Sequence, residues 1–228
     1  LARRRLEEEV RDLSELQGEP ITRVACDLHP DYYATVYARS LGLPVTEVQH
    51  HVAHAMALVG EHGLSRPALI VVWDGTGLGL DDTIWGGEFL LWEGDTIRRV
   101  AHLRPFLLPG GDAAARQGHR SALGILHALG AADQVSLTDR DTAIRSLLNS
   151  GRHCTKTTSA GRLFDAAAAL GAGILESRFE GDAAMRWEAL ADPHEAGTYP
   201  VDFAEGQLDW GPALLALMED TSSPATKS

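Results

Sequence analysis

Two histidines one helical turn apart, His50 and His54, are the residues of this sequence whose type and spacing first suggest chemistry. Side chains four residues apart on a helix share a face, with Cβ atoms about 5–6 Å apart. Two imidazoles so placed could close on one Zn²⁺ or Fe²⁺ ion. The chain has ten histidines, so such a pair also arises by chance. On spacing alone, two surface or capping histidines are the favoured interpretation, and His51 is expected to point elsewhere on the helix.

A second candidate site is Asp74-Gly75-Thr76-Gly77, which directly follows the apolar run Ala68–Trp73. A carboxylate at the end of a buried strand can bind a metal, and glycines let backbone N–H groups approach an anion. The segment lacks both the Gly-Lys-Ser/Thr of a P-loop and the Gly-x-Gly-x-x-Gly of a dinucleotide-binding motif. A tight turn between two strands explains the pattern equally well, so both interpretations stay open.

A third candidate is the stretch Thr157-Thr-Ser-Ala-Gly-Arg-Leu-Phe-Asp165. Its Thr and Ser residues are typical helix caps, which is the favoured interpretation of the stretch alone. Arg162 and Asp165 would nevertheless share one helix face, where Arg could hold a phosphate and Asp could accept from ribose hydroxyls. A fourth segment, Phe179-Glu-Gly-Asp182, reads as a glycine turn before a helix.

The two cysteines, Cys26 and Cys154, do not suggest a nucleophile or a thiolate zinc site. They form no Cys-x-x-Cys pair, and Cys154 has no nearby base in the sequence. Cys26 is expected to be a small buried residue, and Ser159 lies in no Gly-x-Ser-x-Gly elbow. A disulfide framework is not expected, so the expected compartment is a reducing cytoplasm.

The composition is that of an ordinary globular protein: 228 residues, 44% hydrophobic, 23% charged, with a net charge of −12. Such an acidic surface disfavours loose binding to nucleic acid or anionic membranes, because both are polyanions. No apolar run approaches the ~20 residues that a membrane span needs. The first residues predict an amphipathic helix, not a signal peptide, and without an initiator Met the chain is expected to begin inside a longer protein.

The elements that must position these residues are predicted to be α/β in the first half and mostly helical in the second. Hydrophobic periodicity and turn residues predict strands over Ile21–Asp27, Pro44–Gln49, Ala68–Trp73, Thr83–Trp92 and Thr96–Leu103. The run Ala68–Trp73 is nearly all apolar, which fits a strand covered on both faces. Helices are predicted over residues 2–16, Tyr32–Leu41, His50–His62, Ala113–Leu129, Asp139–Asn149, Leu163–Leu170 and Gly181–Ala191.

The C-terminal part shows fewer regular patterns. Pro193–Gly211 is rich in turn residues, and Glu219–Ser228 is expected to be a frayed or disordered tail. The predicted organisation is therefore one domain over residues 1–218, followed by the tail.

In series, these segments resemble the carbamoyltransferase domain of the HypF family of hydrogenase-maturation proteins and, more distantly, the TsaD-type threonylcarbamoyl transferases. The order of the matching stretches makes the resemblance specific, and they cover roughly residues 22–191. They are Cys26-Asp-Leu-His-Pro-Asp-Tyr-Tyr-Ala-Thr, Val48-Gln-His-His-Val-Ala-His-Ala, Trp73-Asp-Gly-Thr-Gly-Leu-Gly, Trp85-Gly-Gly-Glu-Phe, Leu108-Pro-Gly-Gly-Asp-Ala-Ala, Thr158-Ser-Ala-Gly-Arg-Leu-Phe-Asp-Ala and Phe179-Glu-Gly-Asp-Ala-Ala-Met.

The resemblance implies an actin/Hsp70-like ATPase fold of the ribonuclease H-like class, with two lobes around a nucleotide cleft. It implies a divalent metal, Fe or Zn, held by His50, His54 and Asp74. It also implies that Gly75, Thr76 and Gly77 face a phosphate or carbamoyl group, and that Asp165 and Gly181 hold the nucleoside.

The activity that the resemblance implies is carbamoyl transfer. The substrate would be carbamoyl-adenylate, made from ATP by a separate upstream domain, and the acceptor would be the C-terminal cysteine of a HypE-like partner. The carbamoyl group would later become a cyanide ligand of a nickel–iron hydrogenase. Arg162 would add positive charge near the phosphate.

The sequence departs from the family pattern in three places. Arg116-Gln-Gly-His-Arg120 replaces the usual Arg-Glu-Pro-Trp-Arg, and Thr158 replaces a Ser. The closing Ser-Gly-Gly loop and a later metal-binding Asp have no counterpart before Ser228. We therefore expect an incomplete fold and metal set, in a fragment that lacks the family's upstream domains.

Two alternatives stay open at this point. One is an O-carbamoyltransferase of antibiotic biosynthesis, which shares the same motifs. The other is a catalytically silent interaction module of the same fold. A sugar kinase of this superfold is disfavoured, because no segment resembles its sugar-binding loop.

Overall fold

The structure is a computed structural model that describes residues 2–227; Leu1 and Ser228, the ends of the predicted domain and tail, lie outside the described residues. An N-terminal lobe contains α1 (Ala2–Gln17), β1 (Val24–Asp27), α2 (Tyr33–Ser40) and β2 (Val45–Val48). The two strands pair in parallel, with Val24 opposite Val45 and Asp27 opposite Val48. Strand β1 is shorter than predicted, because its pairing with β2 begins only at Val24.

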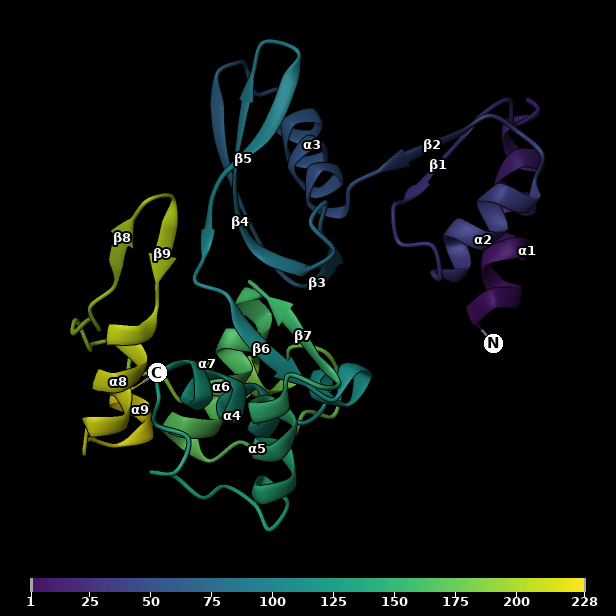
Figure 1. The fold of residues 1–228 in the computed structure, drawn as a ribbon. Helices are drawn as coiled ribbons and strands as arrows, with labels where there is room; N and C mark the ends of the chain where they lie inside the picture. Colours follow the sequence, from purple (N-terminus) through teal and green to yellow (C-terminus); the bar gives the residue numbers. More distant parts are fainter. Residues whose placement is uncertain (1, 228) are drawn as a thin grey trace.

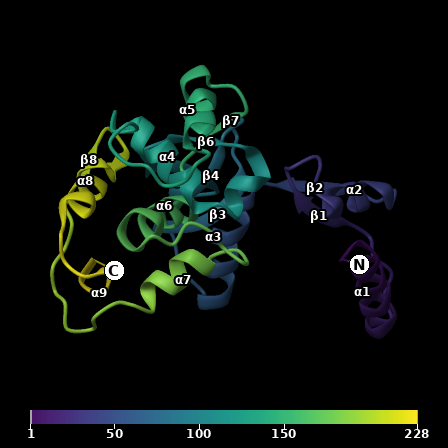
Figure 2. The ribbon, with the colours of Figure 1, turned by 90° about the horizontal axis from the view of Figure 1, so that it is seen from below.

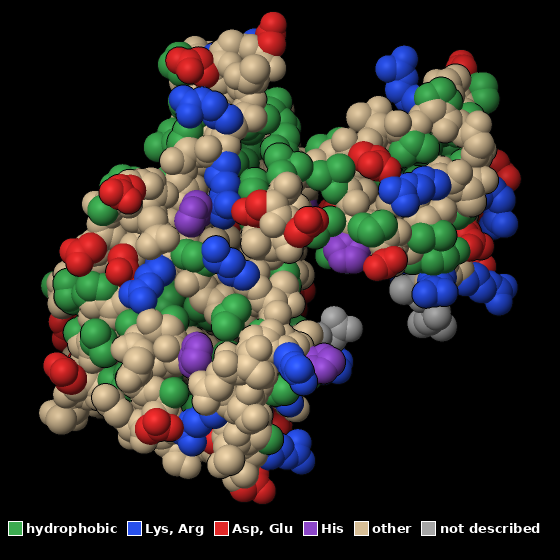
Figure 3. Space-filling view, viewed as in Figure 1, with side chains coloured by type: hydrophobic (Ala, Val, Ile, Leu, Met, Phe, Trp, Pro, Cys, Tyr) green, Lys and Arg blue, Asp and Glu red, His purple; other side chains and the backbone are tan. Residues whose placement is uncertain are grey.

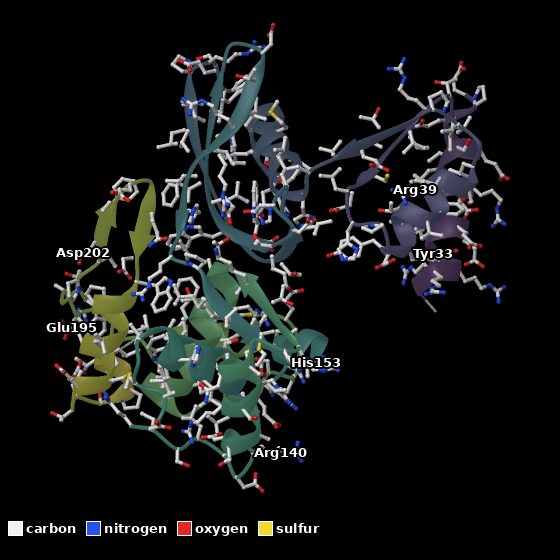
Figure 4. The ribbon with its side chains drawn as sticks, in the orientation of Figure 1. Tyr33, Arg39, Arg140, His153, Glu195 and Asp202 are labelled. Carbon is white, nitrogen blue, oxygen red and sulfur yellow. The ribbon has the colours of Figure 1, made fainter. Side chains whose placement is uncertain are left out.

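Side-chain contacts hold the helices of this lobe to one another and to the sheet. The Tyr33 hydroxyl on α2 donates to Glu7 on α1. Arg39, near the end of α2, donates to the Glu47 carboxylate on β2 at 2.6 Å. Figure 4 shows Tyr33 and Arg39 together in the lobe, well apart from His153 in the main body.

Helix α3 (His50–His62) joins the lobe to an antiparallel meander of β3 (Ala68–Leu78), β4 (Ile84–Glu93) and β5 (Thr96–Leu103). The predicted boundaries of α3 are confirmed, and Gly63 ends the helix in the left-handed conformation at φ 58°. The β4–β5 hairpin is also confirmed. The helix packs on the meander through a small apolar core of Ala55, Val59, Ile70, Val72 and Leu90.

Two predictions about β3 are wrong. Only one of its faces is covered, because Leu69, Val71 and Trp73 are 61%, 48% and 56% exposed. The expected loop after Trp73 instead continues the strand to Leu78. Its pairing with β4 shifts between Trp73, opposite Gly87, and Gly77, opposite Trp85, which is a bulge in the ladder.

The main body begins with β6 (Phe106–Pro109), the 3₁₀ helix η1 (Gly111–Ala115), α4 (Gly118–Ala128) and α5 (Asp141–Ser150). It continues with β7 (Cys154–Thr157), α6 (Ala160–Ala172) and α7 (Asp182–Glu188). The continuous helix predicted over Ala113–Leu129 is therefore broken at its start. The four alanines Ala166–Ala169 bury α6 against α4 within the largest apolar core.

The C-terminal segment carries more structure than its turn residues suggest. Residues 193–211 contain the short hairpin of β8 (Asp202–Ala204) and β9 (Gln207–Asp209), and α8 (Gly211–Glu219) follows. The segment expected to be a disordered tail contains the one-turn helix α9 (Pro224–Lys227). The larger sheet runs β6-β7-β4-β5-β9-β8, with β3 paired to β4.

The N-terminal lobe stands to one side of the body in both ribbon views (Figures 1 and 2). In the space-filling view the lobe joins the body through a narrow neck, with an open hollow beneath it (Figure 3). No helix within residues 2–227 is both long enough and apolar enough to span a bilayer.

Candidate metal and nucleotide site

The histidine pair begins α3, directly after β2 ends. Gln49 caps the helix: its side-chain oxygen accepts from the Val52 N–H at 2.9 Å. Its Nε2 donates to the Leu78 carbonyl at 3.0 Å, which ties the start of α3 to the end of β3. His50 and His54 then lie on one face, with ring centroids 4.8 Å apart.

The structure brings Asp74 to this histidine pair. Its Oδ2 lies 3.0 Å from His50 Nε2 and 3.8 Å from His54 Nε2, and the two Nε2 atoms are 3.2 Å apart. The three candidate ligand atoms all lie within 4.8 Å of one another. Asp74 Oδ2 is buried and has no hydrogen-bond partner among the described residues. Three acceptor atoms that face one another in this way suit a shared cation, and imidazole and carboxylate are common zinc and iron ligands.

Asp27, which was not among the predicted site residues, contacts His50 on the side of the ring away from Asp74. Its Oδ2 is 2.7 Å from His50 Nδ1. The parallel register places Asp27 opposite Val48, so the carboxyl ends of both strands meet beside the first turn of α3. An acidic residue at the end of a predicted strand was the available signal, although β1 itself is only partly buried.

His51 was expected to point away from the site, and this prediction is wrong. The side chain is fully buried, and its Nε2 lies 3.7 Å from Asp74 Oδ2. Burial lowers the pKa of His51 to about 4, although the charges of Glu88 and Asp74 oppose this effect. A Cβ atom at Gly77 would meet the His51 ring at 2.6 Å, so only glycine allows β3 this close to α3. Gly77 therefore packs against the histidine rings.

Arg162 and Asp165 lie on one face of α6, as their spacing predicts. Arg162 Nη1 is 3.0 Å from Asp165 Oδ2, and both side chains are buried. Burial raises the pKa of Asp165, and nearby Arg162 partly offsets this. Ser159 caps the helix: its Oγ accepts from the Arg162 N–H at 3.0 Å. The same hydroxyl lies 3.1 Å from the Asp74 carbonyl and 2.8 Å from the Gly75 carbonyl, so α6 begins directly against the bulge of β3.

Two cavities open beside this junction. One of about 320 Å³ is lined by Trp73, Asp74, Gly75, Ala160, Gly161, Arg162, Phe164, Glu180 and Gly181. Another of about 250 Å³ includes Gly75, Thr76, Arg162 and Glu180. Gly181 precedes α7 at φ 80°, a conformation that favours glycine. Asp165 lines neither cavity, and the Gly75 N–H donates to Asp74 Oδ1 at 2.6 Å.

Glu88 is a second residue near the site that was not predicted. It is fully buried at the centre of β4. Its Oε1 accepts from the N–H groups of Gly86 and Gly87 at 3.0 and 3.1 Å, and its Oε2 accepts from Arg99 Nε at 2.5 Å. The Thr158 hydroxyl, one residue before the cap of α6, also donates to Oε1. A single carboxylate thus fixes β4, β5 and the start of α6 together.

Fold and site together define the class of protein. It is a mixed α/β, Kae1-like domain of the ATPase type, with a histidine–carboxylate cluster between the start of α3 and strand β3. Residues 70–228 match the family described as carbamoyltransferase, Kae1-like domain, second subdomain, and residues 1–61 match the HypF Kae1-like domain. The chain belongs to the HypF carbamoyltransferase family. His50 and His54 lie in the first matched segment, and Asp74 lies in the second.

Curated relatives and solved structures agree with this assignment. The chain is 36% identical to carbamoyltransferase HypF of Synechocystis sp., over 95% of this chain and 32% of that protein. It is 38% identical to a HypF homolog of Cupriavidus necator, over 90% of this chain and 56% of that protein. The chain thus spans about a third of the first relative and just over half of the second.

A crystal structure of full-length HypF in a phosphate- and nucleotide-bound form superposes with a TM-score of 0.84 at 32% identity, over 96% of this chain and 31% of that one. The structure of T. kodakarensis HypF gives 0.86 at 24% identity, over 97% and 33%, and this supports the fold alone. The predicted fold class is confirmed.

Proposed function

We propose that this chain carries out carbamoyl transfer, from carbamoyl-adenylate to the C-terminal cysteine of a HypE-like acceptor. The product would feed cyanide-ligand synthesis for nickel–iron hydrogenase. The observation that carries the proposal is the convergence of His50, His54 and Asp74 within 4.8 Å, beside a cavity lined by Arg162, in a chain of the HypF family.

His50 Nε2, His54 Nε2 and Asp74 Oδ2 are the atoms that would hold a divalent metal. Their chemistry fits Fe²⁺ or Zn²⁺, and the unpartnered Asp74 oxygen gives such an ion a negative ligand. The bound ion would supply positive charge that polarises the carbamoyl carbonyl and offsets charge on the departing phosphate. Gly77 and the buried His51 keep the ligand helix close to β3.

Arg162 would meet the phosphate of the adenylate. Its guanidinium lines both cavities, and its buried Nε and Nη1 atoms have no hydrogen-bond partner among the described residues. Arg162 Nη1 also lies 3.0 Å from Asp165 Oδ2, so Asp165 would hold the guanidinium while its remaining donors face the phosphate, which can accept two parallel hydrogen bonds. Glu180 lines the same two cavities, so the phosphate would have to lie on the Arg162 side of this carboxylate.

The acceptor thiol would be the nucleophile. Its thiolate would attack the carbamoyl carbon, a C–S bond would form, and the C–O bond to the phosphate would break. AMP would leave with the bonding electrons, and the thiol proton would pass to solvent. Burial raises the pKa of Cys154, which makes its thiolate scarce. Both cysteines are unpaired, which supports a cytoplasmic location.

The test is to incubate the chain with carbamoyl-adenylate, Fe²⁺ or Zn²⁺, and a peptide that ends in the acceptor cysteine. We expect the peptide to gain the mass of one carbamoyl group in wild type but not in Asp74→Asn. A hydroxyl-bearing antibiotic precursor in place of the peptide tests O-carbamoylation. Metal uptake without transfer to either acceptor would contradict the proposal and favour a silent module.

A further inference from the structure

The last residue of β1, Asp27, carries a carboxylate that faces the candidate metal site from the side of the N-terminal lobe. Asp27 Oδ2 lies 2.7 Å from His50 Nδ1, while His50 Nε2 faces Asp74 and His54 on the other side of the ring. Because a carboxylate only accepts, Nδ1 must carry the hydrogen of a neutral His50 ring. The lone pair is then left on Nε2, the atom that faces the other ligands.

Asp27 is itself held from several directions. Its Oδ1 accepts from the His29 N–H at 2.8 Å, and its carbonyl accepts from the Thr35 hydroxyl at 3.1 Å. Thr35 is fully buried in α2, and β1 pairs with β2 up to Asp27 itself. The strands lie side by side in Figure 1. The Asp27 carboxylate is therefore held in place without a ligand: Oδ1 accepts from the loop residue His29, and Oδ2 contacts His50.

The loop that follows Asp27 is ordered by an aromatic stack. His29 and Tyr32 stack with ring centroids 4.1 Å apart and planes 5° from parallel. Tyr32 is half-buried, and its surroundings include the carboxylates of Asp27, Asp74 and Glu180. The loop of the N-terminal lobe therefore lies near the acidic groups of the site.

We infer that Asp27 is a positioning residue for the metal: it fixes the tautomer and ring orientation of His50, so that Nε2 is presented as a ligand. This inference rests on the metal site of the proposed function and adds an outer residue to it. Metal-bound histidines commonly donate their second ring N–H to a carboxylate, which also raises their basicity.

Asp27→Asn is the sharpest variant, because it preserves the size of the side chain and reverses one hydrogen bond. The Asn oxygen can keep the His29 N–H, and its NH₂ group then faces His50 Nδ1. That geometry puts the ring hydrogen on Nε2 and removes the ligand lone pair. Asp31→Asn, at an exposed position in the loop that follows β1, is the matched control.

The experiment measures Zn²⁺ affinity of the 228-residue chain by competition with a chromophoric chelator. We expect Asp27→Asn to weaken Zn²⁺ binding ~10–100-fold and Asp31→Asn to leave it unchanged. Ring ¹⁵N chemical shifts of the metal-free proteins supply a second readout: His50 should carry its hydrogen on Nδ1 in wild type and on Nε2 in Asp27→Asn. A merely structural role would not switch the tautomer. Circular dichroism verifies that each variant is folded.

The inference is overturned if Asp27→Asn binds Zn²⁺ as tightly as wild type, or if Asp31→Asn weakens binding equally. In those cases the metal site itself stands. If wild type takes up no Zn²⁺ or Fe²⁺, both the inference and the metal site of the proposed function fail, so the two failures are distinguishable.

Discussion

The Glu88 cluster and the candidate site both contain buried polar atoms, yet they differ in how those atoms are paired. Around Glu88, both carboxylate oxygens accept hydrogen bonds, and Arg99 also stacks over the Trp85 ring at 4.1 Å. In the candidate site, buried polar atoms have no hydrogen-bond partner among the described residues. They are His51 Nε2, Asp74 Oδ2, Arg162 Nε and Nη1, and both carboxylate oxygens of Asp165; Arg162 Nη1 and Asp165 Oδ2 form an ion pair at 3.0 Å without the geometry of a hydrogen bond.

The difference in hydrogen bonding distinguishes a cluster that stabilises the fold from a site suited to a ligand. A buried polar group without a partner costs about 1–3 kcal/mol, so a protein keeps such groups where a ligand supplies the missing interactions. The Glu88 cluster stabilises the junction of β4, β5 and α6. The atoms around Asp74 and Arg162 lower the stability of the free protein, and under the proposed function a cation and a phosphate would supply their missing partners.

The largest effect on stability is expected for Glu88→Ala. Removal of this carboxylate leaves Arg99 without its buried partner and Gly86 and Gly87 without an acceptor. Such losses cost about 3–5 kcal/mol of unfolding free energy, measurable by urea denaturation. Glu93→Ala, at the exposed end of the same strand, should change the value by less than about 0.5 kcal/mol. Similar values for the two variants would contradict the structural role of Glu88.

Asp141→Asn should have the next largest effect. Asp141 accepts from the Leu137 N–H at 2.7 Å and from the N–H and hydroxyl of Thr138. Burial raises its pKa, but these hydrogen bonds outweigh burial and lower the pKa overall. The expected loss is about 2 kcal/mol at neutral pH. Its contribution is present above the ordinary pKa and is lost as pH falls through the lowered value, so the deficit should shrink in acid.

Asp139→Asn, at a neighbouring exposed position, is the control for this variant. Unfolding curves at several pH values check both proteins. A deficit for Asp141→Asn that stays constant into acid would contradict the lowered pKa.

Asp165→Asn should have a smaller effect, with the opposite dependence on pH. Because burial raises the pKa of Asp165, the protonated form favours folding at low pH, and this contribution is lost as pH rises through the raised value. Asparagine does not ionise, so the variant does not lose stability in this way as pH rises. Relative to wild type, the variant should therefore become more stable as pH rises. If Asp165→Asn and Asp141→Asn respond to pH in the same direction, the comparison of paired and unpaired carboxylates fails.

The smallest effect on stability is expected for Asp74→Asn. The amide can still accept from the Gly75 N–H, and the lost Oδ2 charge had no partner. Unfolding free energy should change by less than about 0.5 kcal/mol while Zn²⁺ binding is lost. Calorimetric titration with Zn²⁺ measures the binding, and Asp82→Asn, at an exposed turn, is the control. Undiminished Zn²⁺ binding would remove Asp74 from the ligand set.

Sequence patterns predicted the elements whose side chains alternate or repeat strongly. Helix α3 was predicted from its periodicity and from Gly63, which ends it. The β4–β5 hairpin was predicted from alternation and from the turn at Gly94. The convergence of Asp74 with the histidines followed from family resemblance, since spacing alone favoured a structural role. The short strands β8 and β9 were missed, because three-residue strands with no buried side chains lack an alternation signal.

The missed site residues depend on long-range pairing. Asp27 faces His50 only because β1 and β2 pair in parallel and in register, which no local pattern specifies. His51 is buried because Gly77, beyond the bulge of β3, packs against its ring. A loop was predicted where β3 continues, so this contact could not be predicted. Glu88 did carry a signal: it is the single charged residue between Ile84 and Trp92 in an otherwise apolar strand.

The bulge in β3 also constrains which insertions and deletions this gene can tolerate. Four residues of β3 span the register step from Trp73 to Gly77, while only two residues of β4, from Gly87 to Trp85, lie opposite. Because strand side chains alternate, loss of one residue here would turn Ile70 and Val72 from the core to solvent. Loss of two residues would keep the alternation and restore a regular ladder with the apolar core intact, but it would remove the bulge that presents Asp74 to the histidines. Strand β3 therefore contains two residues more than its pairing with β4 and the packing of its apolar core require.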